Sequence, residues 1–238
     1  MADAINQFSD PVFLKNLATA FLLGLVPALL WLWFWLREDR EHPEPLGLIV
    51  ITFILGALSV MLVLPLEKFA NSLLDDKNML IVIWASIEEV AKYLAVGLIA
   101  LRSKELNEPI DYPIYFIATA LGFAALENTL FLMHPLAAAD TTTSLITGNL
   151  RFLGATLLHA TSSALVGISL GLSYFNGWFS KKIHLVFGLA AAITLHSVFN
   201  FFIMKDNGEN FLNVFGFLWV VTIMIMLLFE KLKRMSRQ

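Results

Sequence analysis

The sequence predicts an all-α protein, a polytopic membrane bundle of about seven transmembrane helices. Hydrophobic residues make up 58% of the 238 residues and charged residues only 15%, whereas soluble domains carry about 25% charged residues. The apolar residues gather in stretches long enough to cross a hydrocarbon core of roughly 30 Å, which takes about 20 residues. Because the connections between these stretches are short, we expect one integral-membrane domain over residues 1–238.

Seven stretches meet this length criterion. They cover approximately residues 13–36, 46–66, 79–101, 113–133, 150–174, 182–204 and 210–230. The first ends in Trp31, Trp33 and Trp35, an aromatic belt typical of a membrane interface. Cysteine is absent, which excludes disulfides, thiolate metal sites and a cysteine nucleophile. No basic stripe is interleaved with aromatic residues, so we expect membrane lipid as a partner and no nucleic acid.

The distribution of Lys and Arg between the connections predicts the orientation. With the N-terminus outside, ten basic residues fall on the inner side: Arg37, Arg40, Arg102, Lys104, Lys181, Lys182, Lys231, Lys233, Arg234 and Arg237. Only four fall on the outer side: Lys15, Lys68, Lys77 and Lys205. Cytoplasmic connections carry the excess of Lys and Arg. We therefore expect a multi-pass protein of the cell membrane with its N-terminus outside and its C-terminus in the cytoplasm.

The third predicted span carries Glu88, Glu89 and Lys92 where a membrane helix is normally apolar. Each charged residue costs about 2.5–3.5 kcal/mol near the centre of a membrane helix. Such residues are kept only where they face a polar interior with partners. The later spans offer six candidates: Glu127, Asn128, Arg151, His159, His196 and Asn200.

The depth of these groups in the membrane indicates a single site. At a rise of about 1.5 Å per residue, Glu88 and His159 each lie about 13 Å from the outer ends of their helices. On the same scale Glu127 lies about 9 Å and His196 about 12 Å from theirs. Four antiparallel helices thus place ionisable groups in one layer of the outer half of the bilayer.

Spacing along each helix indicates which of these groups share a face. Glu88 and Lys92 are four residues apart, so they lie on one face and can pair. His196 and Asn200 have the same spacing. Glu89 is turned about 100° from Glu88 around the helix, so it need not point at the same place.

Two kinds of chemistry suit this set, and the residues leave both open. A glutamate and a histidine can activate water, while a second histidine with an asparagine can donate hydrogen bonds to an oxyanion. Alternatively, Glu88, Glu127, His159 and His196 could hold Zn²⁺, because nitrogen and oxygen ligands with one open position suffice for a hydrolytic metal. Lys92, Asn128 and Arg151 would be supporting charge or hydrogen-bond partners.

Four motifs, each in its own span, resemble the motif series of the PrsW family. They are Glu88-Glu89-Val90-Ala91-Lys92, Gly122-Phe123-Ala124-Ala125-Leu126-Glu127-Asn128, His159, and His196-Ser197-Val198-Phe199-Asn200. The segment Asp39-Arg40-Glu41-His42-Pro43-Glu44-Pro45 also looks like that family's acidic, proline-containing connection. The resemblance covers the chain from about Asp39 to Phe201. PrsW proteins are similar to the type II CAAX-prenyl endopeptidases and to a scaffolding subunit of γ-secretase.

The resemblance implies an intramembrane endopeptidase that cuts a single-span membrane protein such as an anti-sigma factor. The motif residues of the family carry over to Glu88, Glu89, Glu127, His159 and His196. In the prenyl endopeptidases a Glu and a His activate water, and a His and an Asn bind the oxyanion. Those enzymes have His where this chain has Glu127, so the pairing of imidazoles with carboxylates stays open. The family has been classed both as metallo-type and as glutamic-type.

From residues and resemblance together we expect a protease acting near the extracytoplasmic face of the membrane. Glu88 and His159 are the predicted water-activating pair, and His196 and Asn200 the predicted oxyanion donors. Two alternatives belong to other classes. The first is a non-catalytic scaffold whose polar layer binds a partner helix, and the second is an ion-coupled carrier.

Overall fold

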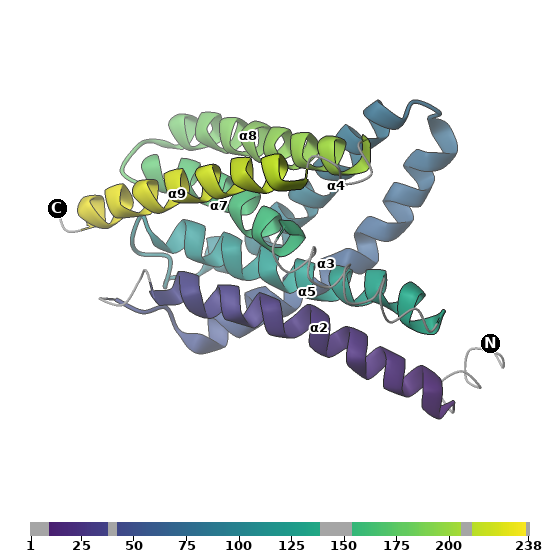
Figure 1. Cartoon of the computed structure of the whole chain (residues 1–238). Helices are drawn as coiled ribbons and strands as arrows, with labels where there is room; N and C mark the ends of the chain where they lie inside the picture. Colours follow the sequence, from purple (N-terminus) through teal and green to yellow (C-terminus); the bar gives the residue numbers. More distant parts are fainter. Residues whose placement is uncertain (1–9, 38–41, 139–153, 206–210, 237–238) are drawn as a thin grey trace.

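The computed structural model of the chain describes residues 10–37, 42–138, 154–205 and 211–236, and within these ranges it contains helices and no strand. The long helices are α2 (Pro11–Leu36), α3 (Leu46–Leu73), α4 (Lys77–Leu98), α5 (Asp111–Ala137), α7 (Thr156–Leu172), α8 (Trp178–Lys205) and α9 (Phe211–Ser236). Helix α2 begins and α9 ends at opposite ends of the molecule (Figure 1), as expected for an odd number of antiparallel spans. The predicted fold class is confirmed.

Five of these helices, α2, α3, α5, α8 and α9, are long and apolar enough to cross a membrane, and α7 is a shorter apolar helix. The remaining long helix is α4, which carries the charged residues of the third predicted span and packs against α3, α5 and α8. The chain is a multi-pass membrane protein. The orientation from Lys and Arg counts stays a prediction.

Several helix ends differ from the predicted ones; for example, α8 begins at Trp178 instead of near residue 182, and α9 continues to Ser236 instead of ending near residue 230. Helix α3 continues to Leu73 instead of ending near residue 66. Helix α4 ends at Leu98 and is followed by the short 3-10 helix η2 (Ala100–Arg102). Helix α7 begins at Thr156, and residues 150–153 of the predicted fifth span lie outside the described ranges. The extension of α3 matters most, because it adds a wall to the functional site.

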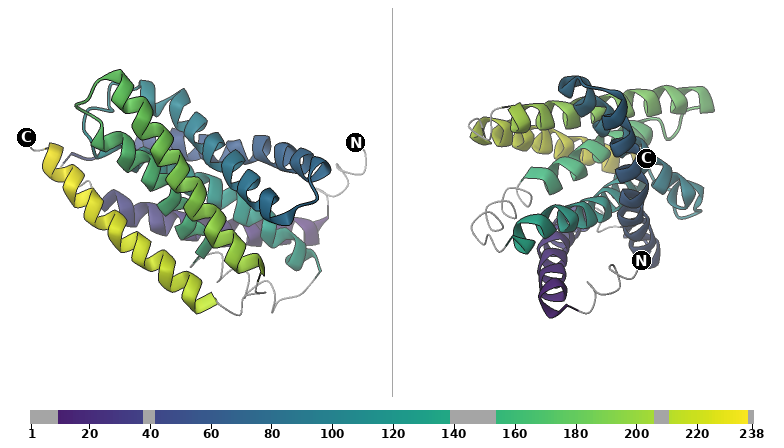
Figure 2. Two further views of the ribbon diagram at one scale, coloured as in Figure 1. Left: turned by 90° about the horizontal axis from the view of Figure 1, so that it is seen from above. Right: turned by 90° about the vertical axis from the view of Figure 1, so that its right-hand side faces the viewer.

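Helix α5 lies at the centre of the bundle. Of the apolar stretches in the candidate spans, that of α5 is 72% buried against 17–33% for the others. It packs against α2, α3, α4 and α7, while α7 in turn packs against α8 and α9. In Figure 1 and in the right view of Figure 2, α8 and α9 lie on one side of the bundle and α2 on the other. The functional side chains described below project from α5 and from the helices around it.

Helices α3 and α5 cross in close backbone contact at two glycines. A Cβ atom on Gly56 would overlap the carbonyl oxygen of Thr119, and one on Gly122 would overlap that of Phe53. Small residues allow membrane helices to approach in this way. Past the crossing, α3 runs to its turn with α4 at the upper right of Figure 1, and a cavity lies between this part of α3 and α5.

We expect Gly56→Ala to destabilise the protein by about 1–3 kcal/mol, because the added methyl overpacks the crossing. The free energy of unfolding can be measured by titrating the protein in mixed micelles with sodium dodecyl sulfate. Gly47→Ala, in the first turn of the same helix, is the matched control because a Cβ there meets no atom within 4 Å. Equal stability of the two variants would contradict a close crossing at Gly56.

Candidate active site

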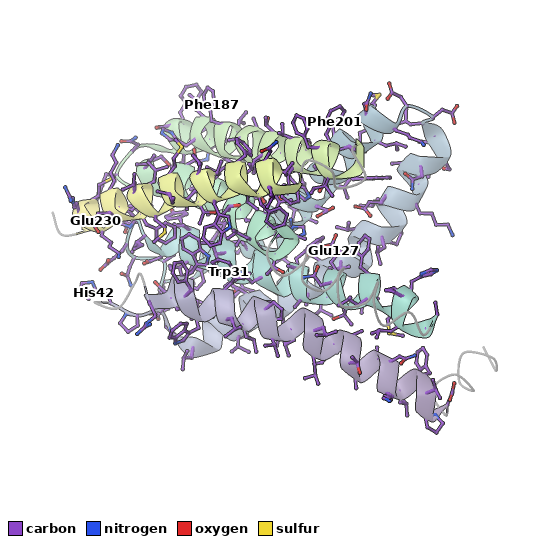
Figure 3. The ribbon with its side chains drawn as sticks, viewed as in Figure 1. Trp31, His42, Glu127, Phe187, Phe201 and Glu230 are labelled. Carbon is purple, nitrogen blue, oxygen red and sulfur yellow. The ribbon has the colours of Figure 1, made fainter. Side chains whose placement is uncertain are left out.

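A cavity of about 440 Å³ lies between α3, α4, α5, α7 and α8. Apolar side chains form part of its wall, for example Val60, Val63 and Phe123. Its polar and indole-bearing lining residues are Glu67, Asn71, Trp84, Glu88, Glu127, His159, His196 and Asn200. Figure 3 labels Glu127 on the α5 wall. Among the residues that the structure describes, no lysine or arginine lines this cavity.

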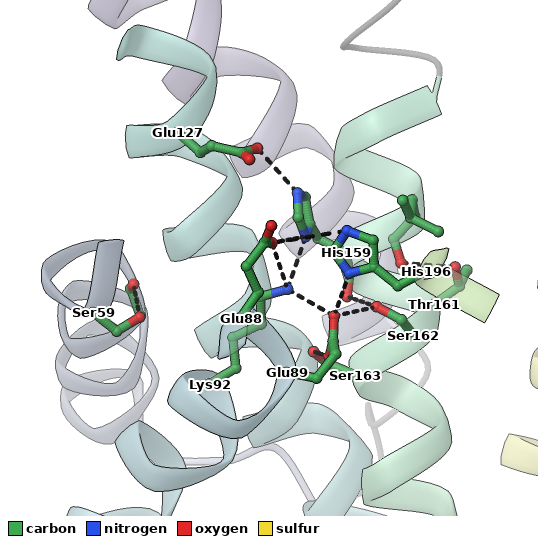
Figure 4. A network of polar contacts seen from close by, with 12 residues as sticks. Ser59, Glu88, Glu89, Lys92, Glu127, His159, Thr161, Ser162, Ser163 and His196 are labelled. Atoms are coloured by element: carbon green, nitrogen blue, oxygen red, sulfur yellow. Dashed lines mark hydrogen bonds and ion pairs between the residues drawn. The ribbon is translucent and has the colours of Figure 1, made fainter. Parts of the chain in front are cut away.

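Glu89 lies at the centre of a hydrogen-bond network, with partners on α4, α7 and α8 (Figure 4). Its Oε1 accepts hydrogen bonds from Lys92 Nζ at 2.8 Å, Ser162 Oγ at 3.0 Å and His196 Nδ1 at 2.8 Å. Its Oε2 accepts from Ser163 Oγ at 3.1 Å. The side chain is 1% exposed. A buried carboxylate with a cation and several donors is well satisfied, so Glu89 holds other groups in place.

Glu88, one residue earlier on α4, is equally buried but has no such set of donors. Its Oε2 lies 3.8 Å from His159 Nδ1, 3.8 Å from His196 Nε2 and 3.6 Å from Lys92 Nζ. This oxygen is buried and has no hydrogen-bond partner among the residues that the structure describes. A buried acceptor without a partner costs about 1–3 kcal/mol. Such an atom in a native protein calls for an explanation, and catalysis or ion binding is one.

The two imidazole rings are each held by a carboxylate at one nitrogen. His196 Nδ1 is bonded to Glu89, so its Nε2 faces Glu88. His159 Nε2 lies 3.1 Å from Glu127 Oε2, so its Nδ1 faces Glu88 and also lies 2.8 Å from Lys92 Nζ. A carboxylate at one ring nitrogen fixes the tautomer and leaves the other nitrogen as an acceptor or ligand. Both second nitrogens therefore face Glu88 Oε2, and that of His159 also contacts Lys92.

The structure brings together most of the residues that the sequence singled out. Six form one contact network: Glu88, Glu89, Lys92, Glu127, His159 and His196. Asn200 lines the same cavity. Asn128 instead donates its Nδ2–H to Thr156 Oγ1 at 2.9 Å and joins α5 to α7. Arg151 lies outside the described residues.

The structure adds two details to the expected pairing. Lys92 forms the expected ion pair with Glu88 at 3.6 Å, and its ammonium forms a closer one with Glu89 at 2.8 Å. Glu89 does point into the same network as Glu88, although about 100° separates neighbouring residues on a helix. Both side chains can do so because α7 and α8 both pack against α4, and donors on these two helices meet Glu89.

Glu67 on α3 is a member of the site that the sequence reasoning missed. Its carboxyl group lines the cavity, close to that of Glu88. The predicted second span ended at residue 66, which left Glu67 in the connection. The signal that could have found it is the apolar pattern that resumes after Lys68, at Phe69, Ala70 and Leu73.

Comparison with known proteins agrees with this arrangement. The sequence profile of the PrsW family intramembrane metalloproteases matches residues 44–229. The chain belongs to the PrsW family. It is similar to Protease PrsW of Halalkalibacterium halodurans, with 28% identity over 74% of this chain and 80% of that protein. It is 27% identical to Protease PrsW of Clostridioides difficile over 78% of this chain and 79% of that protein.

A third relative, Protease PrsW of Shouchella clausii, is 28% identical over 91% of this chain and 96% of its own length. No solved structure matches the chain at a significant level. The PrsW-family assignment makes this chain an intramembrane protease, whose substrate is a membrane protein and whose surroundings are lipid. It also raises the question of a metal, which the family's description includes.

Three side chains of this PrsW-family protein could hold a metal ion. Glu88, His159 and His196 each offer one ligand atom, and these atoms all lie within 4.8 Å of one another. Glu127, the fourth ligand suggested by the sequence, is not part of this group within the described residues. Its Oε2 contacts the ring nitrogen of His159 instead.

Proposed function

We propose that the protein hydrolyses a peptide bond of a single-span, membrane-anchored protein inside the cavity around Glu88. An anti-sigma factor is the kind of substrate that the family resemblance implies. The observation that carries the proposal is Glu88 Oε2, a buried oxygen without a hydrogen-bond partner that two imidazole nitrogens face at 3.8 Å each. The Lys and Arg distribution supports a site near the extracytoplasmic face.

The donor set fits a divalent metal ion, and Zn²⁺ suits it best. A ligand set of two imidazoles and one carboxylate with an open position is typical of hydrolytic zinc sites. Zinc–ligand bonds of about 2.0–2.2 Å place the ligands of a tetrahedral site roughly 3.4 Å apart. The 3.8 Å separations of Glu88 Oε2 from both imidazole nitrogens are close to that value. A bound zinc ion supplies Lewis-acid activation of water and of the peptide carbonyl.

The carboxylates behind the two histidines also fit this role. Glu89 accepts from His196 and Glu127 contacts His159. Such outer carboxylates orient a ligating imidazole and raise its basicity. Glu127, whose side chain is 16% exposed, is placed to accept the proton of the attacking water. Asn200 lines the cavity and can donate its amide N–H to the oxyanion of the tetrahedral intermediate.

A metal-free arrangement is the second candidate, and one contact favours it. Lys92 Nζ lies 2.8 Å from His159 Nδ1, so a metal ion and the ammonium compete for the same nitrogen. In the metal-free arrangement Glu88 and His159 activate the water. His196 and Asn200 then donate hydrogen bonds to the oxyanion, as the sequence predicts. Both arrangements form the C–O bond with water and release the amine after it takes up a proton.

Metal removal distinguishes the two arrangements. We expect chelator treatment of the purified protein to lower cleavage of a single-span substrate by roughly 10²-fold or more, since the ion would generate the nucleophile. Added Zn²⁺ should restore the rate. Metal content, measured by mass spectrometry of the same samples, should fall and rise with the activity.

The ligand variants provide the matched comparison. Glu88→Gln, His159→Ala and His196→Ala should each lose bound zinc, whereas His184→Ala should retain it. His184 is the control because it lies at the other end of α8 and contacts Ser180. Full activity of a protein shown to be metal-free would overturn the metal arrangement and leave the Glu88–His159 pair.

A further inference from the structure

Glu67 and Asn71 on α3 face Trp84 and Glu88 on α4 across the cavity. All four residues line it, and each pair is spaced four residues apart, so each pair lies on one helix face. Glu67 contacts Glu88, and Trp84 Nε1 donates to Asn71 Oδ1 at 3.1 Å. The cavity therefore runs from the catalytic Glu88 along the α3–α4 hairpin for about one helical turn, roughly 5 Å.

The charges of this cavity are not balanced by the protein's own cations. Lys92, which is 1% exposed, balances Glu89, its partner at 2.8 Å. Three further carboxylates, Glu67, Glu88 and Glu127, line the cavity, with no lysine or arginine among the described lining residues. Carboxylates this close together repel one another when ionised, and a cationic group brought in by the substrate would stabilise their ionised form.

Glu67 is the group most in need of a new partner during the reaction. Glu127 keeps its contact with His159. Glu88 directs its Oε2 toward the two imidazoles. Glu67 is half-buried at the cavity wall, so a substrate in the cavity can reach it. Beside it lie an amide and an indole ring, and indole is the aromatic group that attracts cations most strongly.

We propose that Glu67 is a specificity residue that binds a basic side chain of the substrate, Lys or Arg, next to the peptide bond that is cut. Asn71 and Trp84 complete this subsite: the amide oxygen accepts a hydrogen bond, and the indole packs against the aliphatic stem of the basic side chain. The inference rests on the proposed function, because it assigns the substrate class of the same cavity. It makes Glu67 a residue of substrate recognition and not of bond cleavage.

The test uses two single-span peptides that differ at one position beside the mapped cleavage site, one with Lys and one with Gln. Kinetic constants are measured with the full-length protein in detergent micelles, and dissociation constants with the His159→Ala variant. We expect the Lys peptide to have a roughly tenfold or greater advantage in KM and Kd, as for a partly desolvated charge pair. In Glu67→Gln this ratio should fall to about one, and in Glu67→Asp it should be partly retained.

Glu105→Gln is the matched control, because Glu105 is an exposed carboxylate in the α4–α5 connection, outside the cavity lining, and this variant should keep the full Lys-to-Gln ratio. Equal KM and Kd for the two peptides in the unchanged protein would overturn the proposal. So would a preference for Lys that persists in Glu67→Gln, or a loss in Glu67→Gln that falls on kcat alone. If no peptide is cleaved and no cleavage site can be mapped, a Lys preference in Kd that depends on Glu67, found with Lys at successive positions of the peptide, would support the subsite and overturn the proposed protease function.

Discussion

Replacing Glu88 by Gln is expected to abolish cleavage, with a fall in kcat of roughly 10²–10⁴-fold, the range typical of a lost acid–base group. The amide neither takes up the proton of water nor binds a metal ion as a carboxylate does. Gln has the shape of Glu, and Glu88 Oε2 has no hydrogen-bond partner to lose. The protein should therefore still fold and insert. The measurement is single-turnover cleavage of a single-span substrate by purified protein in detergent micelles.

Glu230→Gln is the control for this variant, because Glu230 is an exposed carboxylate whose recorded partner is Arg234 at 3.3 Å. It should cleave at the rate of the unchanged protein. His159→Ala should show the same loss as Glu88→Gln, and the double variant little more, since residues of one catalytic unit are not additive. Full activity of a correctly folded Glu88→Gln protein would refute the assignment of the site.

Replacing Lys92 by Met is expected to lower the free energy of unfolding by about 3–5 kcal/mol, the usual result of leaving a buried charge without its partner. Glu89 would keep His196 and the two serine hydroxyls of α7 but lose its nearest cation. Met fills a similar volume to Lys, so the loss of stability measures the missing charge and not the creation of a cavity. Unfolding in mixed micelles with sodium dodecyl sulfate measures the effect.

The double variant Glu89→Gln, Lys92→Met separates pairing from packing. Removing both charges should recover part of the lost stability, because Glu89 no longer leaves an unpaired buried charge, while Glu88 still loses its ion pair with Lys92 at 3.6 Å. Lys68→Met, at an exposed position of α3, should leave the free energy of unfolding nearly unchanged. Single and double variants with the same loss would show that the pair of Lys92 with Glu89 contributes nothing to the stability.

The fold was predictable because span length and hydropathy are one-dimensional properties of the chain. Continuous apolar stretches indicated every long helix, including α4, whose charged residues interrupt an otherwise apolar pattern. The end of α3 was placed too early because Glu67 and Lys68 resemble a polar helix end. Its continuation to Leu73 depends on the neighbouring helices, which shelter Glu67 beside Glu88.

The sequence predicted the depth of the site residues in the membrane but not the directions in which their side chains point. Rise per residue places Glu88, His159 and His196 in one layer without any knowledge of packing. Which way Glu89 turns depends on which helices flank α4, and the sequence alone does not contain that information. For the same reason Asn128 could not be distinguished from a site residue until its hydrogen bond to Thr156 was seen.

The crossing of α3 and α5 at Gly56 and Gly122 divides α3 into a part that is held against α5 and a part beyond it with an exposed outer face. At the crossing, no side chain larger than hydrogen fits, so a larger residue at either position would push the two helices apart. Beyond it, the same helix presents Met61, Leu62 and Phe69 outward, away from the cavity lining. Substitutions on that outward face would alter contacts with lipid, while the two glycines keep the spacing of α3 and α5 that the hydrolytic cavity requires.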